Sequence, residues 1–141
     1  MSYFQSRRSA ILARKGAVAT SQPLAAVAGL QIIKDGGNAI DAAVATAAVL
    51  NVVEPMSTGI GGDMFALIWD KNERKVIALN GSGRQAAAAN VDDVRKSGFD
   101  SIPNNLEGSQ FAVSVPGTVH GWETALNAYG RMTLKEVLKP A

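Results

Sequence analysis

Residues 36–70 of this chain read GGNAIDAAVATAAVLNVVEPMSTGIGGDMFALIWD, and they decide the fold. The stretch runs from a helix-starting signal through an alanine-rich helix into the glycine-rich segment 58–63, and from there directly into an apolar strand. Loops that cradle phosphate follow the order strand, loop, helix, so that the helix amides point at the anion. Here the strand follows the glycines. The order therefore argues against a nucleotide site and for close packing of the backbone.

Start and stop signals bracket two helices in the first third of the chain. Pro23 stands at a first helical position, and apolar residues then recur at helical spacing until Gly36-Gly37 end the segment. Asn38 offers an N-cap to the second helix, with Asp41 in the capping-box position. That helix is rich in alanine and closes before Glu54-Pro55. Because alanine lets neighbouring backbones approach closely, we expect it to be buried between layers.

Apolar runs predict four strands. Residues 64–69 form a continuous apolar run, which is typical of a strand covered on both faces. The polar residues 71–74 separate it from a second run at 75–80, and together they predict a hairpin with a four-residue loop. Shorter apolar runs at 16–21 and 111–115 are also interpreted as strands.

The rest of the chain is more polar. We expect a polar arm at 1–15, a short helix at 91–96, a turn-rich loop at 101–108, a helix at 119–129 and, behind a capping box, a helical turn at 134–138. Buried helices against a buried hairpin indicate a layered α+β or α/β sandwich. The sheet carries more apolar surface than so short a chain can cover, which suggests that the chain is part of something larger.

Composition limits the class of protein. The chain has 141 residues, of which 47% are hydrophobic and 18% charged, enough for one domain with a core. The net charge is only +2, and the basic residues are scattered without interleaved aromatic residues, so nucleic-acid binding is not expected. The absence of cysteine excludes disulfides, thiolate metal sites and a cysteine nucleophile.

The sequence favours a soluble, cytoplasmic chain. Its beginning contains no apolar run of signal-peptide length. The alanine-rich uncharged run 42–53 is too short to span a bilayer, and we expect no membrane partner. No His, Asp or Glu pattern has metal-ligand spacing, and we therefore expect neither a metal nor another cofactor.

Few side chains are candidates for catalysis. His120 is the only histidine, and the sequence gives it neither a nucleophile nor an orienting group, so a helix-face histidine with a hydrogen bond is the simpler interpretation. Ser57 and Thr58 are possible hydroxyl nucleophiles, but no GxSxG elbow or base accompanies them, and backbone capping is more usual beside a proline turn. Asp63 could orient a partner or simply bond glycine amides in a turn.

Arg84 is the strongest candidate for binding a substrate. It follows the run Gly81-Ser82-Gly83 at the end of a predicted strand, and loops on a rigid scaffold often carry function. A guanidinium offers a planar fork that can bind a carboxylate through two hydrogen bonds. Spacing alone leaves this role and that of a surface arginine in a turn equally open.

Six motifs in series resemble the γ-glutamyltranspeptidase family. The resemblance runs in the right order from about residue 10 to the last residue, and the series is far more specific than any one motif. The motifs are Gly16-Ala17-Val18-Ala19-Thr20-Ser21-Gln22-Pro23-Leu24-Ala25, Gly36-Gly37-Asn38-Ala39-Ile40-Asp41-Ala42-Ala43-Val44-Ala45, Val53-Glu54-Pro55, Gly59-Ile60-Gly61-Gly62, Asn80-Gly81-Ser82-Gly83-Arg84 and Ser114-Val115-Pro116-Gly117-Thr118-Val119-His120-Gly121.

The resemblance implies an N-terminal-nucleophile hydrolase with a four-layer αββα sandwich. Precursors of this family cleave themselves into a large and a small subunit. The threonine that begins the small subunit attacks a γ-glutamyl amide, with its own α-amine as base, and the acyl group then passes to water or to an acceptor amine. By this resemblance residues 1–141 are the N-terminal part of the large subunit, and no catalytic residue lies in this chain.

One functional residue carries over from the family. Arg84 falls on the arginine that holds the α-carboxylate of the substrate, whereas the nucleophile and the oxyanion-hole glycines belong to the small subunit. The well-known transpeptidases have an acidic residue directly after this arginine, whereas Gln85 stands here. The Gly-Ser-Gly-Arg form looks more like the acylase-like branch of the family. That departure questions strict specificity for glutamyl groups.

Three hypotheses follow for function. The first is γ-glutamyl transfer or hydrolysis on glutathione-like substrates, by an enzyme whose remaining large subunit and small subunit lie outside this chain. The second is an amidase or acylase of the same fold that takes other acyl groups. The third is a non-catalytic scaffold, because these 141 residues contain no identifiable pair of nucleophile and base.

Overall fold

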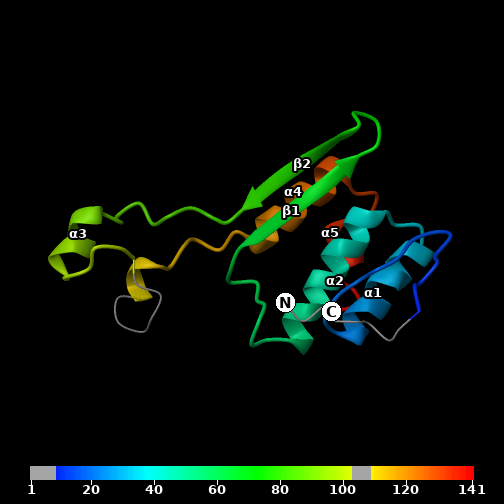
Figure 1. The fold of residues 1–141 in the computed structure, drawn as a ribbon, viewed down its shortest axis with the longest axis horizontal. Helices are drawn as coiled ribbons and strands as arrows, with labels where there is room; N and C mark the ends of the chain where they lie inside the picture. The colour runs from blue at the N-terminus through cyan, green and yellow to red at the C-terminus, as the bar shows by residue number, and fades with distance from the viewer. Residues whose placement is uncertain (1–8, 103–108) are drawn as a thin grey trace.

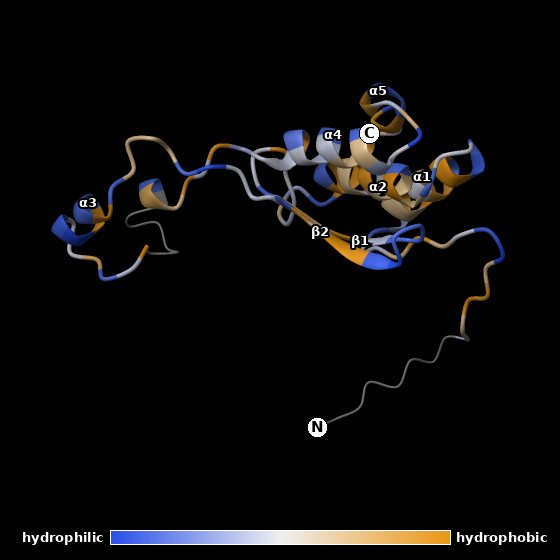
Figure 2. Cartoon of the chain, turned by 90° about the horizontal axis from the view of Figure 1, so that it is seen from above, coloured by the Kyte–Doolittle hydropathy of each residue, from blue (hydrophilic) through white to orange (hydrophobic). Residues whose placement is uncertain are grey.

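The computed structural model describes residues 9–102 and 109–141. Four helices, α1 (Pro23–Lys34), α2 (Ala39–Val53), α4 (Thr118–Tyr129) and α5 (Leu134–Val137), lie on one side of an antiparallel hairpin of β1 (Met64–Asp70) and β2 (Lys75–Gly81) (Figure 1, Figure 2). Helix α3 (Val91–Lys96) and the 3₁₀ turn η1 (Ser109–Phe111) lie on an arm that leaves the hairpin after β2. The chain is therefore an α+β fragment, as the sequence predicted.

The predicted helix boundaries are confirmed within a residue. The Gln22 side chain accepts hydrogen bonds at the start of α1, where Pro23 takes a first-turn position. Helix α1 ends at Lys34, Asp35 is its C-cap, and Gly36 follows with φ +99°, a conformation that favours glycine. Helix α2 ends at Val53, and Glu54 is its C-cap. The four-residue hairpin loop, α3 and α4 also lie where the sequence predicted them.

Asp41 ties the beginning of α2 to the chain between α4 and α5. It is fully buried, and its carboxylate accepts hydrogen bonds from Asn38 N at 2.7 Å, Arg131 N at 3.0 Å and Met132 N at 3.1 Å. The Asn38 side chain completes the predicted capping box and donates to Tyr129 O at 2.6 Å. One buried carboxylate thus satisfies backbone amides from two segments that lie 90 residues apart.

The main core lies around the alanine face of α2. Apart from its alanines, its buried members are Ile32, Val44, Trp122, Leu126 and Val137, contributed by α1, α2, α4 and α5. A second, smaller cluster joins Ala25 and Ala28 of α1 to Val49 of α2. Small side chains on α2 bring these helices close together. The expectation of a helix buried between layers is confirmed for most of its length.

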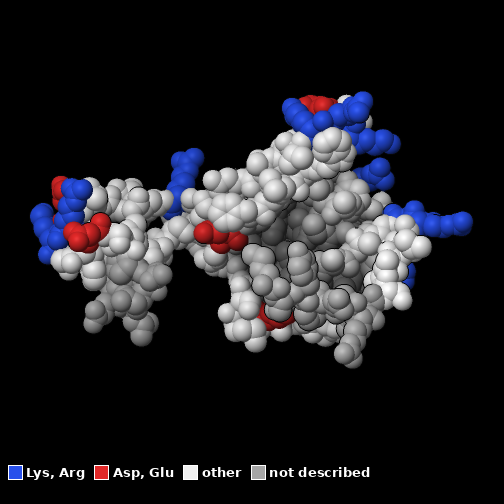
Figure 3. Space-filling model, viewed as in Figure 1, with Lys and Arg blue, Asp and Glu red and all other residues white. Residues whose placement is uncertain are grey.

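The hairpin is covered on one face only by the described residues, which corrects the prediction of a strand buried on both faces. Ile68 of β1 is buried on the helical side, whereas Phe65, Leu67 and Trp69 alternate with the inward residues and are 67%, 79% and 62% exposed. Figure 3 views this outer face and shows little charge on it. The apolar run is suited to two-sided burial, but the four helices α1, α2, α4 and α5 all lie on the other side of the hairpin.

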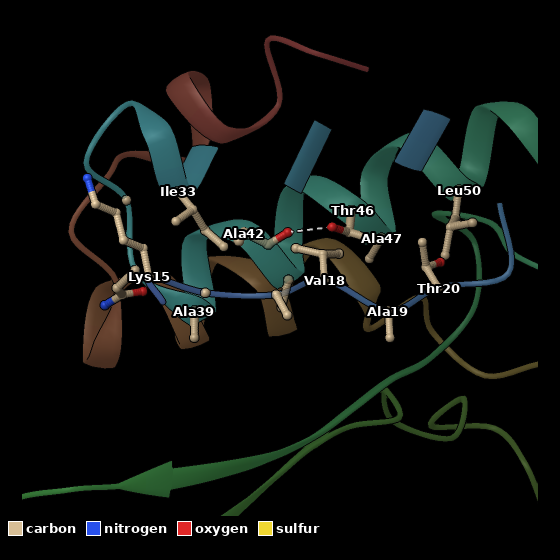
Figure 4. A pocket seen from close by; sticks show the side chains of 15 residues that line it. Lys15, Val18, Ala19, Thr20, Ile33, Ala39, Ala42, Thr46, Ala47 and Leu50 are labelled. Carbon is tan, nitrogen blue, oxygen red and sulfur yellow. Dashed lines mark hydrogen bonds between the residues drawn. The ribbon is translucent and has the colours of Figure 1, made fainter. Parts of the chain in front are cut away.

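Residues 16–21 form no strand, contrary to prediction. A strand needs a hydrogen-bonded neighbour, and in the described part of the chain none pairs with this segment. Instead it runs along α2, where Val18 and Thr20 lie near Ala42 and Thr46 and line a cavity of about 610 Å³ (Figure 4). Of the apolar side chains that suggested a strand, Val18 is partly buried next to Gly29 of α1, whereas Ala17 and Ala19 are exposed.

The prediction of a strand at 111–115 is also wrong. Its first residue ends η1, and the segment makes a single antiparallel bridge, between Ser114 and Gln85. The polar arm predicted at 1–15 is described only from residue 9, where it is exposed and without helix or strand. Residues 103–108 of the loop predicted at 101–108 lie outside the described residues.

Candidate functional site

Three segments meet where β2 ends, and Gly62, Gly81, Gly83 and Gly117 lie at their contact. We call these four residues the glycine junction. Gly62 O accepts hydrogen bonds from the amides of Gly117 and of its neighbour, the first residue of α4, at 3.1 and 3.2 Å. Backbone therefore packs directly on backbone between the glycine-rich loop, the end of the hairpin and the start of α4.

Two junction glycines are required by this close approach. A Cβ on Gly117 would lie 2.5 Å from Gly83 N and nearer still to Gly81 O. Gly83 has φ +76°, and a side chain there would collide with the carbonyl of Val115. Close packing therefore explains the glycines at 81, 83 and 117. The packing role predicted for the glycine-rich segment 58–63 is not confirmed for its own glycines, because a Cβ on Gly59 or Gly61 would meet nothing within 4 Å.

The junction fixes the backbone at Arg84. Arg84 O accepts a hydrogen bond from Val115 N at 2.8 Å, and the next residue forms the bridge to Ser114. The Arg84 side chain is exposed, and among the described residues no acidic group lies within 4.0 Å of its guanidinium. A charged fork on an anchored backbone with no intramolecular ion pair is suited to binding a carboxylate from outside the chain.

Asp63 has a different contact from the one that the sequence suggested. Its carboxylate is exposed and accepts a long hydrogen bond of 3.4 Å from Ser114 Oγ, and no bond to a glycine amide is seen among the described residues. Asp63 and Arg84 thus flank Ser114, one through its side chain and the other through the paired backbone. A negative charge, on Asp63, and a positive charge, on Arg84, therefore lie next to the glycine junction.

The three other candidates have structural contacts or none. His120 is an exposed residue in the first turn of α4, and within the described chain its ring has no hydrogen bond, so only the helix-face part of its interpretation is confirmed. Thr58 Oγ1 donates to Glu54 O at 3.3 Å, which confirms backbone capping. Ser57 is exposed beside it. None of the three contacts a described group that could act as its catalytic partner.

A cavity next to the junction was missed by the sequence reasoning. It has a volume of about 350 Å³ and lies between the end of α2, the glycine-rich loop and the start of α4. Asn51 and Thr118 line it, and both Asn51 Nδ2 and Thr118 Oγ1 are buried without a hydrogen-bond partner in the described structure. Thr118 belongs to a Pro-Gly-Thr turn, and nothing in its sequence context distinguishes a hydroxyl with a partner from one without.

Two broader features concern metals and membranes. Across residues 9–102 and 109–141, no three His, Asp or Glu side chains gather as they would around a metal ion. None of the helices in these ranges combines the length and the apolar character needed to cross a membrane.

The comparisons with known proteins agree with the motif series. The fold is an α+β fragment, in which a layer of helices covers one face of a hairpin. The glycine junction lies at the end of β2. The family model described as gamma-glutamyltranspeptidase matches residues 25–141. The chain belongs to the γ-glutamyltranspeptidase family, in which it matches an N-terminal portion.

Both hydrolases and acylases are similar to this chain. The glutathione hydrolase-like YwrD proenzyme of Bacillus subtilis is 43% identical over 131 residues, which are 93% of this chain and 24% of that protein. The crystal structure of the γ-glutamyltranspeptidase of Helicobacter pylori matches with a TM-score of 0.76 and 33% identity, over 94% of this chain and 38% of that one. The cephalosporin acylase of Bacillus halodurans matches with a TM-score of 0.74 and 41% identity, over 98% and 26%. The chain spans about a quarter of the length of the curated relatives that it matches.

Proposed function

We propose that this chain is the N-terminal part of the large subunit of a γ-glutamyltransferase or hydrolase, and that Arg84 binds the α-carboxylate of the donor. The observation that carries the proposal is the exposed Arg84 side chain, without an ion pair in the described structure, on a backbone held by the glycine junction. Membership of the family supports it, as does the position of Arg84 in the fifth motif.

The chemistry itself belongs to residues outside this chain. In the proposed reaction, the hydroxyl of an N-terminal threonine on the small subunit attacks the γ-glutamyl carbonyl, and its α-amine accepts the proton. The amine product leaves with that proton, and water or an acceptor amine then releases the acyl group. Arg84 contributes by holding the far end of the donor, which fixes the distance from the scissile carbonyl to the nucleophile.

The same proposal explains the uncovered face of the hairpin. Phe65, Leu67 and Trp69 form a single apolar surface that water would otherwise contact. In an αββα sandwich a second sheet packs on this face, and burial of such side chains contributes about 1.5–3 kcal/mol each. Additional strands from the remaining chain would likewise pair with the segment 16–21, which has the composition of a strand but no partner in the described structure.

A second candidate is an amidase or acylase that takes other acyl groups. Gln85, in place of an acidic residue, favours it, and so does the similarity to the cephalosporin acylase. A panel of γ-glutamyl, glutaryl and simple acyl anilides, assayed with the full-length protein, separates the two. Preference for donors without an α-ammonium group supports the acylase, whereas preference for γ-glutamyl donors supports the transferase or hydrolase.

A non-catalytic scaffold is the third candidate, because no nucleophile with a base has been identified among these 141 residues. The gene decides between this candidate and the enzymes. A reading frame that continues for several hundred codons and encodes an internal threonine at a self-cleavage site favours an enzyme. A stop codon directly after residue 141, with no partner gene, favours the scaffold.

The test of Arg84 uses the full-length protein. Loss of a charged hydrogen-bonded fork costs about 1.5–3 kcal/mol, so Arg84→Ala should raise the KM for γ-glutamyl donors by about 10- to 100-fold. The matched control is Arg95→Ala on α3, an exposed arginine whose nearest acidic partner, Asp92, is 4.0 Å away. An unchanged KM in Arg84→Ala would remove Arg84 from the site.

A further inference from the structure

The arm that carries α3 and η1 (Figure 1) contains a cavity of about 530 Å³, which we call the arm cavity. Two aromatic side chains line it, Phe99 and Phe111, whose rings meet edge to face with their centroids 6.4 Å apart. Val94 of α3 also lines it and is buried. The arm therefore has a small apolar core of its own, with an open space beside it.

Three aliphatic side chains of the arm cavity remain in contact with water. Val91, Ile102 and Val113 all line it, and they are 60%, 49% and 67% exposed. Removing apolar surface from water lowers the free energy, and ligand sites in proteins are commonly lined in this way by apolar and aromatic side chains. The walls thus favour an apolar occupant.

The charged side chains of the arm cavity do not require a charged occupant. Asp93, Arg95 and Asp100 line it and are exposed to solvent. Asp93 lies 3.9 Å from Lys96, and Arg95 lies 4.0 Å from Asp92, so these two charges have partners on α3 itself. An uncharged apolar group is therefore the occupant that fits.

The arm cavity begins at the residue that follows Arg84. Gln85 lines it, and the bridge between Gln85 and Ser114 fixes its backbone. The hydrogen bond from Val115 N to Arg84 O, 2.8 Å long, fixes the backbone of Arg84 next to it. A carboxylate bound by Arg84 and a group bound in the arm cavity can thus belong to one ligand.

The chemistry of the donor determines which of its groups can enter the arm cavity. This step rests on the proposed function, in which Arg84 binds the α-carboxylate and the γ-carbonyl meets a nucleophile outside this chain. The α-carbon then has one remaining substituent besides hydrogen, the α-nitrogen. A free ammonium group is costly to bury among apolar side chains, whereas an acylated nitrogen carries no charge.

We propose that the arm cavity binds an apolar acyl group carried by the α-nitrogen of the donor. The neutral Gln85 lies at the start of the cavity, where a carboxylate would instead favour a free ammonium group. The substrates of this class are N-acylated γ-glutamyl amides, in which Arg84 binds the carboxylate and Phe99, Phe111 and Val113 contact the acyl group.

Isothermal titration of the full-length protein with two N-acylated glutamates tests the proposal. N-Acetyl-L-glutamate and N-phenylacetyl-L-glutamate share both carboxylates and differ only in the apolar part of the acyl group. Because burial of a phenyl ring is favourable, the phenylacetyl compound should bind at least about tenfold more tightly. Equal dissociation constants, or no binding of the phenylacetyl compound, would overturn the proposal.

Val91→Asp tests whether the arm cavity provides this difference. The substitution places a carboxylate in the cavity, at the first residue of α3, where a negative charge suits the helix end and should not disturb folding. It should reduce the difference between the two compounds to about twofold or less. The matched control is Val27→Asp on α1, a valine that is 63% exposed and does not line the arm cavity.

Val27→Asp should retain the full difference, and the same ratio of dissociation constants in both variants would contradict the assignment to the arm cavity. The proposed function is tested separately by the KM of free γ-glutamyl donors in Arg84→Ala. If that KM rises while the two acylated compounds bind equally to the unsubstituted protein, only the arm-cavity proposal fails. If that KM is unchanged, the proposed role of Arg84 fails, whatever the acyl group contributes.

Discussion

Buried polar groups have hydrogen-bond partners at one end of α2 and lack them, within the described structure, at the other. At the N-terminal end, the buried carboxylate of Asp41 accepts hydrogen bonds from three backbone amides. At the C-terminal end, Asn51 and the adjacent Thr118 of α4 bury a donor and a hydroxyl without partners in the described structure. A buried polar group that has its hydrogen bonds holds the fold together. A buried polar group without a hydrogen-bond partner lowers the stability of the fold.

This contrast separates the end of the fragment that holds the fold together from the end at which we propose that substrate binds. The Asp41 end joins α2, α4 and α5 around the main core. The other end opens on the glycine junction, an exposed arginine and a cavity. Substitutions at the first end should therefore reduce stability, and substitution of the exposed Arg84 at the second end should change binding rather than folding.

Asp41→Ala should have the largest effect. It leaves the partly buried backbone amides of Asn38, Arg131 and Met132 without their acceptor. We expect the free energy of unfolding to fall by about 3–5 kcal/mol, measured by urea unfolding of the full-length protein. Asp92→Ala, on the exposed first turn of α3, should change it by no more than about 0.5 kcal/mol. Equal effects of the two substitutions would contradict the role of Asp41.

Gly117→Ala should have an intermediate effect, at the other end of α2. Its Cβ would lie 2.5 Å from Gly83 N, so the loop that carries Arg84 has to shift. We expect a loss of about 2 kcal/mol in stability together with a higher KM for the donor. Gly59→Ala is the control, because a Cβ there meets nothing within 4 Å. A normal KM in Gly117→Ala would show that the junction does not position the binding loop.

The smallest effect concerns Glu136 and is a dependence on pH. Hydrogen bonds from the backbone and side chain of Thr133 lower the pKa of this exposed carboxyl below its ordinary value of 4.5. Because the folded-state pKa is depressed, the contribution to stability is present above pH 4.5 and is lost as the pH falls through the lower folded-state pKa. Glu136→Gln should flatten this part of the stability profile, as followed by thermal unfolding between pH 5 and about 2. An identical profile in the variant would refute the capping role.

Local signals predicted most of the fold. Pro23, Asn38 and the Gly36 turn act through nearby backbone atoms, so their consequences could be inferred from the sequence. The strand predictions at 16–21 and 111–115 failed because a strand depends on a partner that may lie anywhere in the chain. The apolar run at 64–69 showed what that strand is suited to contact, but not that the helices of this chain cover only one of its faces.

The candidate site was predictable only in part. Arg84 stood out because it follows glycines at the end of a strand and lies in a family motif. The cavity with Asn51 and Thr118 was not predictable, since these residues lie 67 positions apart and only packing brings them together. Whether a buried hydroxyl has a partner depends on the atoms around it, and a sequence does not contain that information.

The most direct test measures KM for a γ-glutamyl donor in the full-length Asp41→Asn and Arg84→Ala variants, at a temperature where both are folded. We expect Arg84→Ala to raise KM by about 10- to 100-fold without a change in unfolding temperature, because in our proposal Arg84 acts on the substrate. We expect Asp41→Asn to lower the unfolding temperature and to leave KM unchanged. An unfolding temperature that falls in Arg84→Ala while KM stays constant would contradict the division between a structural and a functional end.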